Sequence, residues 1–596
     1  MNFHDDFKDY KWLFRNAVDW DQVIDLYYKE FPTADGIESK EDLIDFFEDI
    51  ASAVGDWAGE SLAPLARKLD EEGAGIVKEG RTVPSETLQK IYDQAKELAI
   101  FGMLGEQKHG GMGLPASVYM FGFIYMCRAD IAAATQIGFY SSILDMIERF
   151  CEDKDKDRLI PLIVNGDISG SMNLTEPGAG SDVGSLSTTA EKIEGEEKLY
   201  KLNGSKIFIT NGGGGIGFVL ARVKGDKPGL EGISLFMVEQ DHAGKEGNNF
   251  EVVKNEEKLG FHGSFTCEVL YEDSIGKLVG EESEGFQYML HLMNEARISV
   301  GLQCLGAIEA CMAYAREYAE TRTQFGKPVI ELPLLKRQFE DWETEKDGFR
   351  AMMVDTIQYF DMYQKLDIKK RHTGELTKEE EEIYDYSLKW VRRRTPLVKY
   401  YGSETFTMLS TKAIQVLGGY GFMKEYDAER WHRDSFAPLL YEGTSQIQSL
   451  MCMKDLMKNI MKNPSKFFQT MMYSHPLGGI INGADDMDRI FRGLQYDFKK
   501  NFASLIVKTL KPEVNYANPA EIAKLFNAKN WMVEEGFSKL MVHAETICQT
   551  QCYLETIRVL RLHAKKDMNR KELFDRYVQL VTPRFEGIYS DWKIRL

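Results

Sequence analysis

The sequence predicts a mainly α-helical protein with a small central antiparallel β domain and a helical extension at its end. Apolar residues recur at three- and four-residue spacing over residues 1–165 and again from 282 onward, as on helices that bury one face. Residues 166–281 instead show short apolar runs separated by turns, without helices between them. With 596 residues, 43% of them hydrophobic, the chain is long enough for several packed domains.

These changes of pattern predict four domains. Residues 1–165 form an N-terminal helical domain, and residues 166–281 form a middle β domain, either a sandwich or a barrel. Residues 282–462 form a C-terminal helical bundle. After Asn463-Pro464, residues 463–596 form a helical extension, which we expect to add packing rather than a regulatory site.

Two glycine-containing segments organise the middle domain. Asn203-Gly204 lies between two strand-like runs and predicts a hairpin turn there. Residues 211–217 (NGGGGIG) resemble a phosphate-binding loop, but a dinucleotide fingerprint must open a helix and the next residues (FVLARV) read as a strand. We therefore interpret residues 211–217 as a connection between strands.

The bundle begins with a regular apolar stripe. One buried face is predicted from Leu302, Leu305, Ile308, Met312 and Ala315, which follow helical spacing. A highly charged stretch, residues 365–382 (KLDIKKRHTGELTKEEEE), interrupts the helical pattern and predicts an exposed loop that caps the next helix.

Charge and composition exclude several classes of protein. The 73 basic and 93 acidic residues give a net charge of −20, which argues against a nucleic-acid binder or an anionic membrane surface. No apolar run reaches the roughly 18 residues of a membrane span. The eight cysteines lack CxxC spacing, which favours reduced thiols in a cytoplasmic location, and the histidines form no metal-binding motif.

Three small, polar, glycine-rich segments are candidates for chemistry. Residues 172–182 (MNLTEPGAGSD) are either a surface loop or a place where backbone approaches a ligand closely. Residues 415–422 (QVLGGYGF) are either a helix C-cap or a ligand contact. Glu442, within residues 440–448 (LYEGTSQIQ), is either a solvated N-terminal carboxylate or a desolvated base with a raised pKa.

Taken together and in this order, the motifs resemble the acyl-CoA dehydrogenase family. The hallmarks are TEPGAGSD at 175–182, FITN at 208–211, RTQFG at 322–326, QVLGGYG at 415–421 and YEGT at 441–444. The resemblance covers about residues 40–460. The segments 258–267 and 293–301, the charged insertion and the extension look like the long branch of about 600 residues, which includes enzymes acting on 3-methylmercaptopropionyl-CoA.

The resemblance implies a bound FAD that is shared between subunits, and hence a homodimer or homotetramer. It places Leu174 and Thr175 at the flavin ring, Phe208 over one flavin face and Thr210 near the reactive N5. The diphosphate and ribose in the same subunit are implied to contact Thr444 and Gln446. The remote end of a neighbouring subunit's FAD is implied to contact Arg322, Phe325, Gln415 and Gly419.

The implied reaction is the α,β-dehydrogenation of an acyl-CoA thioester, as in fatty acid β-oxidation, with Glu442 as the base that removes the Cα proton. Glu442 needs a largely dry site, to which Tyr441 and the leucines before it contribute. The substrate would also meet Ser181, Gly443 and Arg297, although a salt bridge within the bundle is an equal alternative for Arg297. Some relatives carry the base on a bundle helix, but the matching position here is Ala296, and its neighbour Glu295 points about 100° away.

The electron acceptor implied by the family is an electron-transfer flavoprotein. An acyl-CoA oxidase, which passes electrons to oxygen, is the first alternative. The second is a scaffold that keeps the fold without the activity. The net charge and the absence of a basic tail argue against the DNA-associated relatives of the family.

Overall fold

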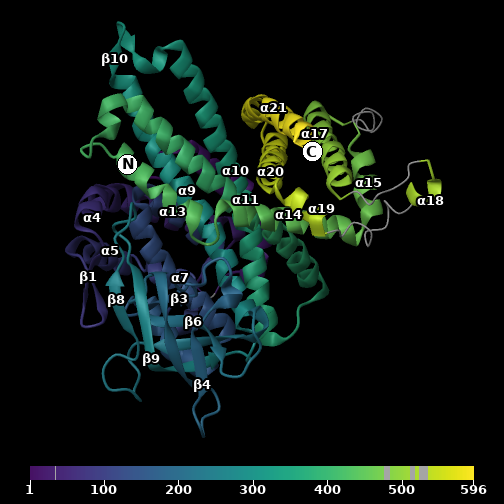
Figure 1. Ribbon diagram of the computed structural model, residues 1–596. Coiled ribbons are helices and arrows are strands. Elements are labelled where there is room, and N and C mark those ends of the chain that lie inside the picture. The colour runs from purple at the N-terminus through teal and green to yellow at the C-terminus, as the bar shows by residue number, and fades with distance from the viewer. Residues whose placement is uncertain (34, 476–483, 511–516, 523–533, 596) are drawn as a thin grey trace. The chain divides into compact units, whose positions relative to one another are not determined.

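The computed structural model describes residues 1–595 except 34, 476–483, 511–516 and 523–533 (Figure 1). The chain forms two compact units. Unit 1 contains Met1–Tyr318, Ile357–Leu388 and Phe406–Pro438, and unit 2 contains Ala319–Thr356, Lys389–Thr405 and Leu439–Leu596. The predicted fold class is confirmed, whereas the boundaries of the four domains stay a prediction.

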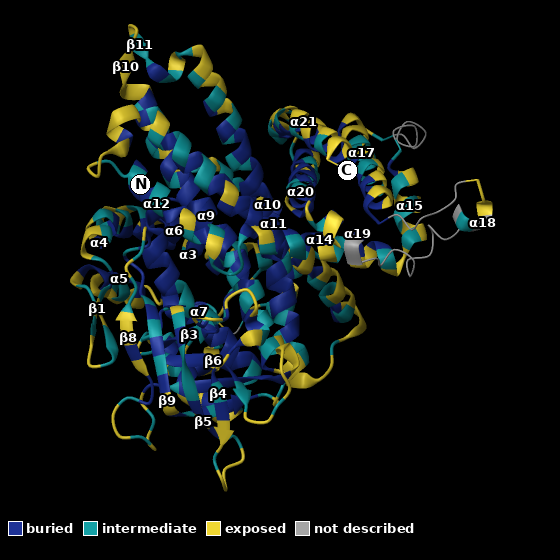
Figure 2. Ribbon diagram, viewed as in Figure 1, coloured by how far each residue is buried: buried dark blue, intermediate teal, exposed yellow. Residues whose placement is uncertain are grey.

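The N-terminal part of unit 1 is helical, as predicted. All residues of α6 are buried, and most of α7 is buried as well (Figure 2). A short hairpin that the sequence analysis missed joins β1 to β2 through Glu79 and Gly80, both with positive φ as such a two-residue turn requires. The elements are α1 Lys8–Trp12, α2 Trp20–Tyr27, α3 Lys40–Trp57, α4 Ala66–Glu72, β1 Gly75–Lys78, β2 Arg81–Pro84, α5 Glu86–Glu97, α6 Ala116–Ala129, α7 Ile131–Phe150 and α8 Asp153–Val164.

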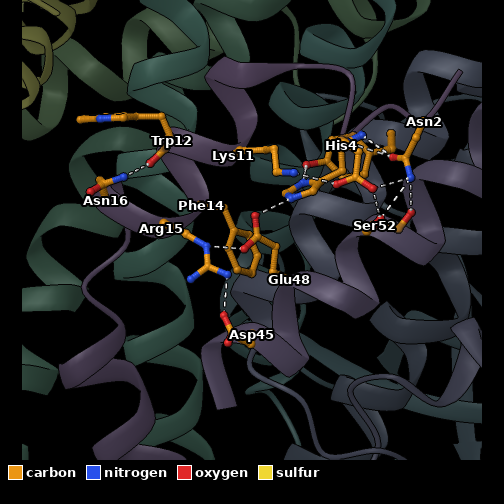
Figure 3. Close-up of polar contacts among 12 residues, drawn as sticks. Asn2, His4, Lys11, Trp12, Phe14, Arg15, Asn16, Asp45, Glu48 and Ser52 are labelled. Carbon is orange, nitrogen blue, oxygen red and sulfur yellow. Dashed lines mark hydrogen bonds and ion pairs between the residues drawn. The ribbon is translucent and has the colours of Figure 1, made fainter. Parts of the chain in front are cut away.

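Buried polar contacts attach the first residues of the chain to this helical layer (Figure 3). His4 is fully buried, with Nδ1 2.8 Å from the Tyr125 hydroxyl and Nε2 3.1 Å from Glu48 on α3. Arg15 donates to the same Glu48 and to Asp45, the latter at 2.5 Å. Burial lowers the pKa of His4, so the ring favours its neutral form in this contact.

The β domain is a closed barrel. β6 pairs with β4 and β7, β7 with β9, β9 with β5, and β5 with β4, so the ring of strands has no open edge. The pairings are mostly antiparallel, but β3 and β4 each run parallel to β6. The strands are β3 Ser169–Asn173, β4 Thr189–Lys192, β5 Leu199–Thr210, β6 Gly215–Val223, β7 Ile233–Glu239, β8 Glu251–Asn255 and β9 Thr266–Val279.

The hairpin predicted at Asn203-Gly204 is wrong, because β5 runs straight through these residues. The register against β9 shifts between Leu202 and Gly204, because two residues of β9, Glu272 and Asp273, lie opposite Asn203 and form a bulge on β9. The Asn203 side chain exchanges hydrogen bonds with Asp273 on β9, at 3.0 and 2.9 Å. Because β5 pairs with β4 on one edge and with β9 on the other, Asn203-Gly204 stays in an extended strand despite its preference for a turn. Residues 211–214 connect β5 to β6, which confirms the predicted strand connection, and residues 215–217 already belong to β6.

Three long helices follow the barrel: α9 Gly285–Thr321, α10 Pro333–Thr373 and α11 Lys378–Leu417. The predicted apolar stripe of α9 is buried, which confirms it. An 18-residue window of α9 is apolar enough by composition to cross a bilayer, but 83% of it is buried within the protein, as in a core helix.

The exposed loop predicted at 365–382 is wrong for most of its length. α10 continues to Thr373, and α11 already begins at Lys378 with a capping box formed by Thr377 and Glu380. The charged side chains of this stretch form ion pairs between the two helices. Lys369 donates to Glu380 at 2.7 Å and Lys370 to Glu381 at 3.0 Å. Only the residues between the two helices form a loop.

The predicted extension is helical, and it joins α10 and α11 within unit 2. Arg394 of α11 is fully buried and pairs with Asp355 of α10 and, at 3.4 Å, with Glu555 of α20. The eight cysteines are free, and most of them are buried. The remaining helices are α12 Ala428–Asp434, α13 Phe436–Leu440, α14 Ser445–Lys462, α15 Pro464–Tyr473, α17 Asp486–Thr509, α18 Pro519–Ile522, α19 Glu534–Met541, α20 Ala544–Lys566 and α21 Lys571–Ile594.

Candidate active site

The segment after β3, residues 174–182, is here named the Thr175 loop. It starts alongside β5: the carbonyl of Leu174 accepts a hydrogen bond from the Lys206 ammonium at 3.1 Å, and the carbonyl of Thr175 accepts one from the Ile207 amide at 3.0 Å. Leu174 is buried and Thr175 half-buried. The two residues predicted to meet a flavin ring therefore lie beside the strand that carries Phe208.

A buried ion pair fixes the Thr175 loop. The carboxylate of Glu176 accepts hydrogen bonds from Lys206 at 2.8 Å, from the Ser187 amide and hydroxyl at 2.6 Å, and from Thr188. Glu176 is 3% exposed and Lys206 is fully buried. The carboxylate therefore closes the loop against the barrel.

For the pKa of Glu176, Lys206 and the hydroxyl donors together outweigh burial, whereas burial dominates for the pKa of Lys206. Burial by itself would raise the pKa of Glu176, but Lys206 and the hydroxyl donors lower it to about 2. Burial lowers the pKa of Lys206 to about 8, even though Glu176 favours its charged form. Three separate residues donate to the carboxylate of Glu176, and these hydrogen bonds favour its ionised form. The sequence analysis missed this pair. Lys206 could have indicated it, because a lysine at an inward-facing strand position needs a charged partner.

Phe208 is exposed, whereas the next residue of β5, Ile209, is buried. Its side chain is 62% exposed, and its φ of +59° is a left-handed conformation that bulky residues rarely adopt. Nothing lies within 4 Å of where a Cβ would stand on Gly178 or Gly180 of the nearby Thr175 loop. The protein thus presents an aromatic face and bare backbone, with room for a planar ligand.

Other predicted residues of unit 1 occupy different settings. Ser181 is exposed and Thr210 is half-buried, opposite Thr266 of β9. Gln415 is exposed at the end of α11, and Gly419 has open space around it after Gly418 caps that helix. The 415–422 segment is therefore a helix C-cap that leaves Gly418 and Gly419 accessible, whereas Gly421 is buried.

Among the buried charged residues of α9, Arg297 and Glu295 lie at or next to the predicted site. Arg297 donates to Asn294 at 2.9 Å, one turn earlier on the same helix. Glu295 is 6% exposed, and burial together with nearby Asp145 raises its pKa well above its usual range. This raised pKa favours the neutral form of the Glu295 carboxyl.

In unit 2, residues 441–444 between α13 and α14 form what we name the Glu442 loop. Both Glu442 and Gly443 have positive φ, +56° and +90°. The side-chain amide of Gln448 donates to the carbonyls of both residues, at 2.9 and 3.0 Å. Thr444 is the N-cap of α14, and its hydroxyl accepts from the Ile447 amide at 3.5 Å.

The surroundings of Glu442 are partly dry. Tyr441 and Glu442 are half-buried, whereas Leu440 is 64% exposed and provides little cover within unit 2. Gln446 is exposed and donates to Glu545 of α20 at 2.7 Å. The predicted desolvation by the preceding leucines is therefore incomplete within this unit.

Arg322 and Phe325 lie on an exposed hairpin after α9. β10 Thr323–Gln324 pairs with β11 Lys327–Pro328, and Phe325 occupies the turn with a φ of +52° and 89% of its surface exposed. The Phe325 ring is therefore open to contact with another molecule.

Three family models match the chain. The acyl-CoA dehydrogenase N-terminal domain matches residues 47–167, the middle domain 171–274 and the C-terminal domain 283–457. An acyl-CoA dehydrogenase of Bacillus subtilis (strain 168) is 30% identical over 66% of this chain and 95% of its own length. A Bacillus anthracis acyl-CoA dehydrogenase, solved with FAD, shares the fold at 21% identity and a TM-score of 0.72, over 92% of this chain and 87% of its own.

The chain belongs to the acyl-CoA dehydrogenase family, whose members are FAD-dependent oxidoreductases. The similarity reaches the long branch: the 3-methylmercaptopropionyl-CoA dehydrogenase of Ruegeria pomeroyi is 29% identical over 75% of both chains. Both the predicted family and the predicted enzyme class are confirmed. The exposed ring of Phe208 and the open backbone of the Thr175 loop fit the isoalloxazine of FAD.

Proposed function

We propose that this enzyme oxidises an acyl-CoA thioester to the trans-2-enoyl-CoA, with Glu442 as the base. The Glu442 loop is the single observation that carries the proposal. It holds a carboxylate-bearing residue at positive φ, through main-chain bonds to Gln448, inside the segment that matches the family's C-terminal domain. Such backbone strain persists where the surrounding structure enforces it, typically at functional sites.

Each residue has a defined task in the proposed reaction. Glu442 removes the Cα proton, while its own backbone N–H donates to the thioester oxygen as negative charge develops there. One such preorganised donor typically lowers the barrier by about 2.7–4 kcal/mol. When bound, FAD supplies the acceptor at N5 for the hydride from Cβ.

The remaining residues of the proposed site bind and orient FAD and the acyl-CoA. Leu174, Thr175, Phe208 and Thr210 hold the flavin ring, and Thr444 and Gln446 hold the diphosphate and ribose. Ser181, Tyr441, Gly443 and Arg297 line the path of the acyl-CoA. Because Arg297 is buried and bonded to Asn294, its role is to shape the site rather than to bind the CoA phosphates.

The test is an assay of Glu442→Gln in the purified, FAD-loaded protein, with thioesters of different chain length and a dye as electron acceptor. We expect the variant to keep its flavin absorbance and to lose most turnover. The matched control is Glu295→Gln, which replaces a buried carboxyl whose raised pKa favours the neutral form, and which should retain turnover. Full activity of Glu442→Gln would overturn the assignment of the base.

The physiological acceptor in this proposal is an electron-transfer flavoprotein. Turnover in air without an added carrier would identify an oxidase instead. A colourless protein with no flavin would support the scaffold alternative.

The proposal extends to assembly and location. The exposed hairpin with Arg322 and Phe325, together with Gln415 and Gly419, contacts FAD of a second copy, so a homodimer or homotetramer is expected. Light scattering of wild type and Phe325→Ser tests this, and a monomeric wild type would refute it.

The eight free cysteines favour a cytoplasmic location, which cell fractionation tests.

A further inference from the structure

Unit 1 contains a cavity of about 240 Å³ that the proposed reaction does not use. Its walls come from the end of α2, the segment 104–116, α7 and α10, and we name it the α7–α10 cavity. None of the residues predicted to bind FAD or the acyl-CoA lines it. The lining residues are Tyr27, Tyr28, Leu104, Glu106, Gln107, Gly113, Leu114, Ala116, Ser141, Leu144, Asp145, Glu148, Gln364, Lys365 and Ile368.

The volume suits a small organic molecule. An engineered apolar cavity of about 150 Å³ already holds benzene. The present cavity is larger and mixes polar groups with the side chains of Leu104, Leu114, Leu144 and Ile368. It therefore suits a ligand that has a short aliphatic part and a polar end.

Two of the three lining carboxylates already have cationic partners. Asp145 accepts from Arg149 at 2.7 Å and from Gln364 at 2.8 Å. Glu106 lies 2.7 Å from the ammonium of Lys108. Neither carboxylate therefore needs a cation inside the cavity.

The third carboxyl group is a hydrogen-bond donor near neutral pH. Burial, followed by the charges of Asp145 and Glu106, raises the pKa of Glu148 to about 8. Its Oε1 accepts from the Glu106 amide at 3.3 Å. The protonated group carries an O–H that favours an anionic oxygen as its acceptor.

Lys365 supplies a positive charge without an ion-pair partner in the described part of the chain. Its Nζ lies 4.1 Å from the centre of the Tyr27 ring, which lines the same cavity. Tyr27 itself is fixed, because its hydroxyl donates to Asp361 at 2.7 Å. Burial lowers the pKa of Lys365, although the nearby carboxyl groups of Asp361, Glu106 and Glu148 act to raise it.

We infer that the α7–α10 cavity binds the carboxylate group of a short-chain organic acid, with Lys365 as its counter-charge. Lys365, the Glu148 carboxyl and the aliphatic wall match the two ends of such a ligand. The carboxylate could belong to a free acid or to the distal end of a dicarboxylic acyl-CoA, and the second source rests on the proposed function.

The first experiment needs no turnover. The melting temperature of the FAD-loaded full-length protein is measured with butyrate or glutarate, against butyramide at matched ionic strength. We expect both carboxylates, but not the amide, to raise the melting temperature. The inference is overturned if no carboxylate raises it, or if butyramide does so equally.

Variants locate the binding. Lys365→Met keeps the aliphatic stem and removes the charge, so the Kd for the carboxylate should rise about ten-fold or more. Lys370→Met is the matched control on the same helix, since Lys370 pairs with Glu381 and does not line the cavity. If Lys365→Met fails to fold, Lys365→Gln takes its place. Equal affinities in wild type and the charge-removing variant would refute the site.

Kinetics separate the two sources. For a distal carboxylate, Lys365→Met raises KM for glutaryl-CoA and leaves KM for butyryl-CoA unchanged. For a free acid, the melting shift depends on Lys365 but both KM values stay equal to wild type. If the protein binds carboxylates but turns over no acyl-CoA, the proposed function is wrong, whereas the assignment of the α7–α10 cavity still holds.

Discussion

The Thr175 loop of unit 1 and the Glu442 loop of unit 2, proposed to bind FAD and to supply the base, are held by different means. The carboxylate of Glu176 is engaged by Lys206, Ser187 and Thr188 in a buried cluster. The Glu442 loop is held through its main chain, by the two bonds that Gln448 donates to carbonyl oxygens. Side-chain charge thus holds the loop that we propose binds FAD, whereas hydrogen bonds to main-chain carbonyls hold the loop of the proposed base.

This difference fits the two tasks. A loop that supports a cofactor must keep one position, and a buried ion pair with several donors provides that. A base has to change its protonation state, so its position should not depend on the charge of its own carboxylate. Variants of the two loops should therefore fail in different ways.

The largest expected effect is on turnover, from the Glu442 loop. Glu442→Gln should lower kcat by about 10²–10⁴-fold, the usual contribution of a general base, with unchanged flavin content. Stopped-flow reduction of the flavin by substrate measures it directly. A variant that lost FAD instead would show that this loop, too, mainly supports the cofactor.

On the Thr175 loop, Lys206→Met should destabilise the protein by about 3–5 kcal/mol, because it leaves the Glu176 carboxylate buried without a cation. Denaturant unfolding measures the loss, and flavin release should occur at lower denaturant than in wild type. The double variant Lys206→Met/Glu176→Gln should recover part of the stability. No recovery would mean that the loop depends on packing rather than on the ion pair.

The Glu176 ion pair also predicts a pH window. The folded-state pKa of Glu176 is about 2, below its ordinary value of 4.5, so its stabilisation is present above pH 4.5 and is lost as pH falls toward 2. The shift corresponds to at most about 3 kcal/mol. Unfolding curves of wild type and Glu176→Gln should converge over this range, and parallel curves would contradict the prediction.

The smallest effect compares two glycines. Gly443→Ala should cost about 1–3 kcal/mol or a matching part of kcat, because φ is +90° and the new Cβ would lie 2.9 Å from the Gln448 amide. Gly178→Ala has no such neighbour, so it should leave protein stability unchanged and weaken only FAD binding. Flavin titration of the apoprotein together with thermal unfolding separates the two. Equal behaviour of both variants would remove the contrast between the loops.

The sequence by itself determined the fold class, the family and the two loops, since these depend on periodicity and on motifs that are contiguous in the chain. The buried stripe of α9 and the strand connection at 211–217 were predictable for the same reason. Tertiary contacts explain why β5 continues through Asn203-Gly204, because it pairs there with β9, which carries the bulge. They also explain why residues 365–382 are mostly helical, because their charges find partners. Tertiary structure also decided the Glu176–Lys206 pair and the α7–α10 cavity. Which charges become buried together depends on contacts between residues distant in sequence, and local patterns carry no record of those contacts.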